Sequence, residues 1–256
     1  VNAGLPNVAD ESMSLGDLDG DGNLDLILTG GDNAGVYFGD GQGGFINAEV
    51  GLSSISDGAS AIGDVNDDGN LDFVITGNPG GDPVATVYLG DGAGGFTTAN
   101  AGINGVDFGT TDFGDVNGDG NLDLLVTGDS TSSGDPSTVL YLGDGSGGFS
   151  VANAGLTGVV NSSVEIGDLD GDGNRDLLVT GDSTGGDVPS TTLYLGDGTG
   201  SFTTTSTSFV DVRNGSSALG NLDGDGDLDL ALTGNVQEFG DARRTFVYQN
   251  ESIAAA

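Results

Sequence analysis

The chain has 256 residues, of which 40 are acidic and 4 are basic, so its formal net charge is −36. Without a basic stripe to neutralise phosphates, the sequence disfavours nucleic acid and anionic membrane surfaces as partners, and favours cations. It contains no Cys, His or Lys, so disulfides and the usual general bases and nucleophiles are missing. No apolar run approaches the roughly 20 residues that a membrane span requires, which argues against membrane insertion.

The first conspicuous element is the stretch "GDLDGDGNLDLILTG", which begins at Gly16. Close variants begin at Gly63, Gly114, Gly167 and Gly220, and their first loop residues are separated by 47, 51, 53 and 53 residues. A repeat period of this size indicates a solenoid, a propeller or an array of small domains.

Each repeat is expected to contain four short strands. The loop runs into an apolar stretch, and a later segment such as "VYLGDGAGGF" has the apolar run, Gly/Asp turn and restarting aromatic residue that are typical of a β-hairpin. In the third repeat the expected strands are Thr111–Gly114, Leu122–Thr127, Thr138–Leu142 and Phe149–Ala152. Since no segment has a sustained helical period, the sequence predicts an all-β fold of four-stranded antiparallel propeller blades.

The two ends of the chain predict how the ring closes. The fifth repeat stops without its fourth strand, and the opening "VNAGL" matches "ANAGL" at Ala152–Leu156, which follows a fourth strand. We therefore expect a single domain over residues 1–256, a five-bladed β-propeller closed by an N-terminal strand at Val1–Ala3. Five blades cut from a larger propeller are the alternative. The first residue is Val1, which favours removal of a signal peptide or of the rest of a longer chain.

The five loops share a pattern of oxygen-bearing side chains. Counted from the first loop residue, positions 1, 3, 5 and 9 are always Asp or Asn, and position 6 is always Gly. These candidate metal ligands are Asp17, Asp19, Asp21, Asp25; Asp64, Asn66, Asp68, Asp72; Asp115, Asn117, Asp119, Asp123; Asp168, Asp170, Asp172, Asp176; and Asn221, Asp223, Asp225, Asp229. Hard oxygen ligands at alternate positions around a Gly turn suit Ca²⁺ better than Mg²⁺ or softer metals.

An EF-hand and a metal-free loop are two alternatives to this calcium site. An EF-hand needs Glu at loop position 12, where this chain has Leu28, Ile75, Val126, Val179 and Leu232. A metal-free cluster of Asx turns remains possible, although unneutralised carboxylates this close together repel one another.

The "DxDGDGxxD" loops, the "LDLLVTG" strands and the later "LGDGxGGF" turns together resemble the FG-GAP/VCBS repeats of integrin α-subunit propellers and secreted bacterial proteins. The resemblance implies a Ca²⁺-binding β-propeller with up to five ions, one per blade. It also implies that position 7 binds the ion through its backbone carbonyl, which adds Asn23, Asn70, Asn121, Asn174 and Asp227. Two residues depart from the pattern: Asn221 at position 1 of the fifth loop and Arg175 at position 8 of the fourth.

These observations predict a structural role for Ca²⁺ and a non-enzymatic protein. Because cytosolic Ca²⁺ is too scarce for weak structural sites, we expect the protein to be extracellular or at a cell surface. The leading hypothesis is an adhesion or binding module that recognises a protein or a glycan. The alternative is a structural subunit of an extracellular filament, surface layer or matrix, whose partners are copies of itself.

Overall fold

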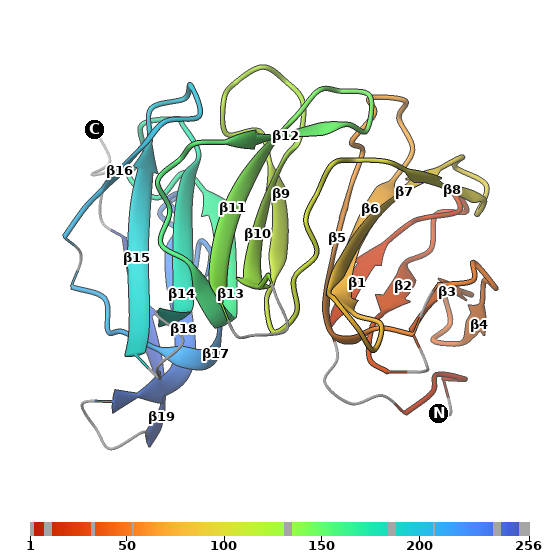
Figure 1. Cartoon of the computed structure of the whole chain (residues 1–256), viewed down its shortest axis with the longest axis horizontal. Coiled ribbons are helices and arrows are strands. Elements are labelled where there is room, and N and C mark those ends of the chain that lie inside the picture. The colour runs from red at the N-terminus through yellow and green to blue at the C-terminus, as the bar shows by residue number, and fades with distance from the viewer. Residues whose placement is uncertain are drawn as a thin grey trace.

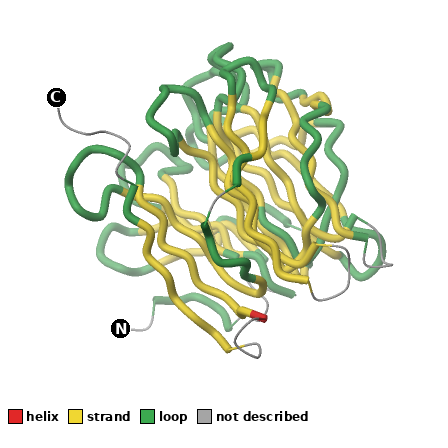
Figure 2. The backbone as a smooth tube through the Cα atoms, turned by 90° about the vertical axis from the view of Figure 1, so that its left-hand side faces the viewer, coloured by secondary structure: helices red, strands yellow, loops and turns green. Residues whose placement is uncertain are grey.

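A computed structural model of the chain describes residues 3–7, 12–31, 34–52, 54–130, 135–183, 188–206, 208–237 and 242–250. Within these residues the backbone forms strands, turns and loops, with no α-helix and a single 3₁₀ position at Gln237 (Figure 2). No helix of the described residues is long and apolar enough to cross a membrane. The all-β expectation is therefore confirmed for this part of the chain.

The strands follow the sequence repeat, and we call the successive sets repeat one to repeat five. Their bounds are β1 Met13–Gly16, β2 Asp25–Leu28, β3 Gly35–Gly39 and β4 Phe45–Asn47; β5 Ser56–Gly63, β6 Asp72–Asn78, β7 Val84–Gly90 and β8 Phe96–Ala99; β9 Thr111–Gly114, β10 Asp123–Asp129, β11 Pro136–Gly143 and β12 Phe149–Ala152; β13 Val159–Gly167, β14 Asp176–Ser183, β15 Val188–Gly196 and β16 Phe202–Thr204; and β17 Arg213–Gly220, β18 Asp229–Val236 and β19 Ala242–Tyr248.

Repeats one to four each form four antiparallel strands in sequence order, and the described part of repeat five forms three. A single bridge, Ser137 to Val159, links repeats three and four into one eight-stranded sheet. The two middle strands of repeat three are longer than predicted, since their ladder continues through polar pairs such as Thr127 with Thr138 and Asp129 with Pro136. The prediction of repeated four-stranded antiparallel sheets is confirmed.

The repeats follow one another along an arc, with repeat one at one end and repeat five at the other (Figure 1). Among the described residues, β19 pairs only with β18, and no closed sheet is formed. Of the predicted closing strand, Val1 and Asn2 lie outside the described residues, and the Ala3 carbonyl accepts a hydrogen bond from Phe45 N–H in repeat one at 3.0 Å. Ring closure therefore stays a prediction.

The apolar core lies between successive repeats rather than inside one sheet. Ile27 and Val36 of repeat one cluster with Phe73 and Ile75 of repeat two. Three further clusters join repeat two to three, three to four and four to five. Because a four-stranded sheet is too small to bury its own faces, each repeat depends for stability on its neighbour.

A tyrosine on the third strand of repeats three, four and five reinforces these contacts. The hydroxyl of Tyr141 accepts a hydrogen bond from Asn104 N–H at 3.0 Å, in the segment that connects the previous repeat. Tyr194 and Tyr248 make the same contact in the next two repeats. These tyrosines therefore pack between repeats, as their recurrence predicts.

Replacing Gly143 with alanine is expected to lower the free energy of unfolding by about 3 kcal/mol. A Cβ atom on Gly143, the last residue of β11, would overlap the carbonyl oxygen of Leu122 at the end of the acidic loop. Urea denaturation measures the loss, with Gly81→Ala as the matched control, since a Cβ on Gly81 meets no atom within 4 Å. Equal stability of the two variants would contradict this packing.

Candidate metal centre

Each acidic loop joins the first and second strands of its repeat, and a ladder of side-chain to backbone hydrogen bonds shapes it. In the first loop, Asp17 accepts from Gly22 N–H at 2.9 Å, Asp19 from Asp21 N–H at 3.1 Å, and Asp21 from Asn23 N–H at 2.8 Å. The second, third and fourth loops repeat all three bonds. Alternate side chains are thereby turned toward one centre.

Position 6 must be glycine because the loop reverses there. Gly22 has a φ of 89° and Gly120 a φ of 92°, in a region that residues with a Cβ rarely adopt. The same holds at Gly69, Gly173 and Gly226. The expectation of a sharp turn at this position is confirmed.

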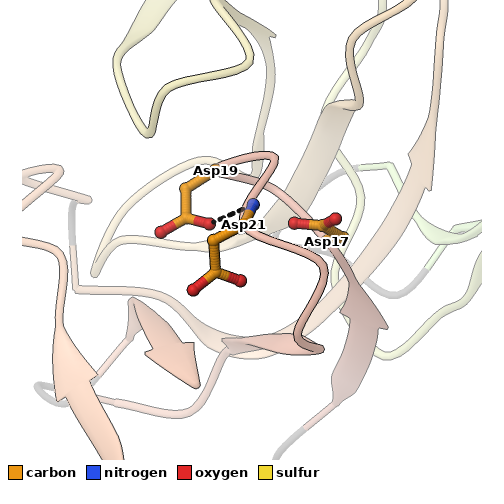
Figure 3. Close-up of side chains that lie close together, drawn as sticks. All are labelled: Asp17, Asp19 and Asp21. Carbon is orange, nitrogen blue, oxygen red and sulfur yellow. Dashed lines mark hydrogen bonds between the residues drawn. The ribbon is translucent and has the colours of Figure 1, made fainter. Parts of the chain in front are cut away.

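The first loop brings three carboxylates together (Figure 3). One oxygen from each of Asp17, Asp19 and Asp21, at positions 1, 3 and 5, lies within 4.8 Å of the others. In the fourth loop the acids that come together in this way are those at positions 1, 3 and 9, Asp168, Asp170 and Asp176. In the other three loops Asn replaces an acid at position 1 or position 3. Burial and the charges of Asp25, Asp21 and Asp17 raise the pKa of Asp19, because an ionised carboxylate is disfavoured beside others.

The donor atoms fit a hard divalent cation. The loop ladder uses one Asp17 oxygen, whereas Asp17 Oδ1 is buried and has no hydrogen-bond partner among the residues that the structure describes. A buried carboxylate oxygen without a partner is costly unless a cation or water satisfies it. An oxygen-only set of several carboxylates, carboxamides and carbonyls suits Ca²⁺, which takes 6–8 oxygen ligands.

Position 9 has a second role that the loop pattern did not reveal. Asp25 is fully buried, and its two oxygens accept hydrogen bonds from Leu18 N–H at 2.7 Å and Gly39 N–H at 2.9 Å. Equivalent pairs of backbone bonds are made by Asp72, Asp123, Asp176 and Asp229. The position-9 carboxylate thus ties the loop to the third strand or the segment after it.

Burial is the largest influence on the pKa of three of these position-9 acids. It raises the pKa of Asp72, Asp123 and Asp176, and the carboxylates at positions 1, 3 and 5 add to the rise. The backbone N–H donors act in the opposite direction and lower the pKa. A neighbouring cation would favour the ionised form further.

Position 7 connects the loop to the hairpin turn of its own repeat. A Cβ on Gly41 would overlap the side-chain oxygen of Asn23, and Gly92, Gly145 and Gly198 meet the equivalent Asn. The acids of these turns act as turn residues: Asp40 accepts hydrogen bonds from Gln42 and Gly44 N–H, and those bonds lower its pKa.

The two departures from the pattern have local consequences. Asn221 accepts a hydrogen bond from Gly224 N–H at 2.6 Å. In the other four loops the position-1 carboxylate accepts a hydrogen bond from the N–H of the position-6 glycine. Asn221 makes no such bond within the described residues of the fifth loop. Arg175 is exposed, and with Asp115 and Asp168 it lines a cavity of about 730 Å³ between the third and fourth loops.

Each of the first three loops also lies against the following repeat. The Val65 carbonyl in the second loop accepts a hydrogen bond from Gly147 N–H in the turn of repeat three at 3.1 Å. A Cβ on Gly20 of the first loop would lie 2.7 Å from the Gly92 carbonyl oxygen of repeat two. A cation held by a loop would therefore also stiffen the boundary between repeats.

A second acidic feature lies on the first strands of repeats three and four and was missed by sequence reasoning. Asp112 accepts a hydrogen bond from Ile166 N–H at 3.0 Å, and Glu165 accepts one from the Ser217 hydroxyl at 3.1 Å. Burial raises the pKa of Asp112 to about 6 and that of Glu165 to about 7, to which the charge of Asp112 contributes. No motif marks these residues, because their burial arises from packing between repeats.

Glu165→Gln is expected to stabilise the protein at pH 8 and to have little effect near pH 4. The folded-state pKa of about 7 lies above the ordinary 4.5, so the folded protein binds the extra proton between these values. Wild-type stability contributed by Glu165 therefore falls as the pH rises from 4.5 to 7. Thermal melts across this range, with exposed Asp82→Asn as control, measure the difference. A constant difference at all pH values would contradict the buried-acid explanation.

Comparison with known proteins agrees with this architecture. The model of the FG-GAP-like repeat matches residues 17–75, 64–126, 115–179 and 168–232. No curated protein matches the chain in sequence.

Among solved structures, the fold is similar to an Agrocybe aegerita lectin that recognises non-reducing terminal N-acetylglucosamine, with a TM-score of 0.59 and 17% identity over 94% of this chain. The chain spans 63% of that lectin. It is also similar to a mutant Aleuria aurantia lectin in complex with Fucα1-6GlcNAc, with a TM-score of 0.55 and 11% identity over 94% of this chain and 75% of the lectin.

The family matches overlap and together run from the first loop to the second strand of repeat five, well over half of the chain. The repeated sheets and the likeness to lectin β-propellers are the architecture expected of such repeats. The chain therefore belongs to the FG-GAP-like repeat family and has a β-propeller-type fold.

Proposed function

We propose that this protein is a Ca²⁺-binding propeller module over residues 1–256, whose five repeats are five blades and whose five loops each hold one ion. In each loop the ligands would be the side chains at positions 1, 3, 5 and 9 and the backbone carbonyl at position 7. The observation that carries the proposal is the buried Asp17 Oδ1, which has no partner in the described part of the chain and lies in a loop geometry that recurs along it. Bound Ca²⁺ would neutralise the carboxylates and couple loop closure to folding.

The module would act outside the cell as a non-enzymatic recognition domain for a protein or a glycan. Two features support this: the fold is similar to that of lectins, and the sequence contains no His, Cys or Lys to act as a base or nucleophile. Extracellular Ca²⁺ is abundant enough to fill modest sites, whereas sensors of cytosolic Ca²⁺ need micromolar or tighter affinity.

Calorimetric titration and native mass spectrometry test the calcium part. We expect up to five Ca²⁺ per chain, with the fifth loop filling last because Asn221 replaces the carboxylate at position 1, and weaker binding of Mg²⁺. Failure to bind any Ca²⁺ would reject the metal proposal. Glycan and cell-surface protein arrays in Ca²⁺ buffer test recognition, and absence of any saturable binder would reject it.

A second candidate function is a structural subunit of an extracellular filament, layer or matrix. A specific observation favours it: the described repeats one and five expose apolar side chains whose counterparts in inner repeats are partly or fully buried. Sizing in Ca²⁺ buffer at increasing concentration separates this candidate from a monomeric recognition module.

A further inference from the structure

The boundaries between successive repeats share one packing rule. A glycine ends the first strand of each repeat, and apolar side chains of the next repeat close over it. A Cβ on Gly63 would lie 2.6 Å from Leu122, and one on Gly16 would lie 3.1 Å from Leu71 and 3.3 Å from Ile62. Gly114 and Gly167 obey the same rule. Only glycine leaves room for these side chains, so this position is a socket for the following repeat.

Repeat five has the socket without an occupant among the described residues. A Cβ on Gly220 would meet no atom within 4 Å. Leu222 in the fifth loop is 57% exposed, whereas Leu18 and Val116 at the same loop position are 1% exposed. We call Gly220 and Leu222 the repeat-five face.

Repeat one has the complementary side chains, also uncovered. Leu15 is 55% exposed and Leu24 is 60% exposed, although their counterparts Ile62 and Leu71 pack in the core between repeats one and two. A Cβ on Gly43 in the repeat-one turn would meet no atom within 4 Å, whereas a Cβ on Gly94 of repeat two would lie 2.6 Å from Phe38 of repeat one. We call Leu15, Leu24 and Gly43 the repeat-one face.

The two faces are the two halves of one internal boundary, and they lie at opposite ends of the arc (Figure 1). We propose that the repeat-five face of one chain docks on the repeat-one face of a second copy, continuing the packing rule from chain to chain. The contact is head-to-tail, so it builds either a larger ring or a filament. This inference deepens the structural candidate function by naming its contact surface.

The contact joins two strongly acidic chains, so it needs salt and a filled loop. In the inner boundaries the turn of one repeat lies over the acidic loop of the previous one, as Gly92 lies over Gly20. At the proposed contact that loop begins with Asn221, where the other four loops begin with Asp, so its first position carries no charge. Assembly is therefore measured in physiological salt with Ca²⁺, where exposed charges are screened beyond about 8 Å.

Two single variants block the two faces separately. Gly220→Val fills the socket; Gly220 is a strand residue without a positive φ and has open space, so the variant is expected to fold normally. Leu15→Asp puts a charge on the repeat-one face. Analytical ultracentrifugation should show concentration-dependent assembly of the wild type, loss of assembly in either variant alone, and one-to-one dimers when the two variants are mixed, since one intact face remains on each.

A matched variant and a cysteine pair make the test decisive. Gly167→Val, at an inner boundary where a Cβ would lie 2.8 Å from Leu219, is expected to lower the melting temperature, whereas Gly220→Val is not.

The chain has no cysteine, so Leu24→Cys and Gly220→Cys place the only thiols, and a short bismaleimide should cross-link a mixture of the two single variants. The proposal would be overturned if the wild-type protein stayed monomeric at every concentration. It would also be overturned if cross-links formed only within a double variant that carries both Leu24→Cys and Gly220→Cys, since that result would indicate ring closure within one chain. Either result would leave the calcium titration unaffected.

Discussion

Chelation of Ca²⁺ is expected to lower the free energy of unfolding by up to about 13 kcal/mol, enough to unfold the protein. A site held at a hundredfold excess over its dissociation constant contributes about 2.7 kcal/mol, and five independent sites add to this total. The physical reason is the crowding of carboxylates in each loop, in a chain with a net charge of −36. Thermal melts with Ca²⁺ and after exhaustive chelation with EGTA measure the effect.

Two controls accompany the chelation experiment. Asn221→Asp restores the missing charge of the fifth loop and should increase its affinity for Ca²⁺. Added Mg²⁺ should restore less stability than Ca²⁺, because Mg²⁺ keeps several of its waters. A melting curve that does not change on chelation would contradict a structural role for the metal and favour metal-free Asx turns.

Asp123→Ala is expected to lower the free energy of unfolding by about 4 kcal/mol, since it leaves two backbone N–H groups without acceptors and each such loss costs about 1–3 kcal/mol. Asp123 is fully buried, and its two oxygens accept from Val116 N–H and Gly143 N–H, each at 2.9 Å. Urea denaturation at saturating Ca²⁺ measures the change.

Asp119→Ala is the matched control because Asp119 belongs to the same proposed metal site but is exposed. It accepts a hydrogen bond from Asn121 N–H at 2.8 Å, and water can replace it there. The Asp123 variant should therefore lose clearly more stability than the Asp119 variant. Equal losses would show that the metal alone, rather than the buried backbone bonds, accounts for the role of position 9.

Much of the local structure was predictable because it depends on neighbours in the sequence. The strands β9 and β12 begin and end at the predicted residues, Thr111–Gly114 and Phe149–Ala152. The turn at each position-6 glycine follows from the Asp/Asn ladder around it. Local side-chain to backbone bonds and period-two apolar patterns act over a few residues, so the pattern alone specifies them.

Contacts between repeats could not be predicted in the same way. The ion pair of Arg213 with Asp182, at 3.4 Å, joins side chains of different repeats that are 11% and 5% exposed. The raised pKa values of Asp112 and Glu165 likewise arise where two repeats cover them. A repeat pattern predicts that neighbouring repeats pack against each other. Which side chains meet at each boundary depends on the angle between the two sheets.

The sequence by itself determined the all-β repeat, the family and the oxygen-rich loops, since each is written within about 50 residues. Only the tertiary structure showed that the position-9 carboxylate binds the loop to the third strand or to the segment after it. It also showed that repeats one and five lie at opposite ends of the arc (Figure 1). The curvature of the arc accumulates small rotations set by side-chain packing at every boundary. The sequence of a single repeat does not specify this total rotation. The exposure of Leu15 and Leu24 at one end of the arc, and of Leu222 at the other, follows from it.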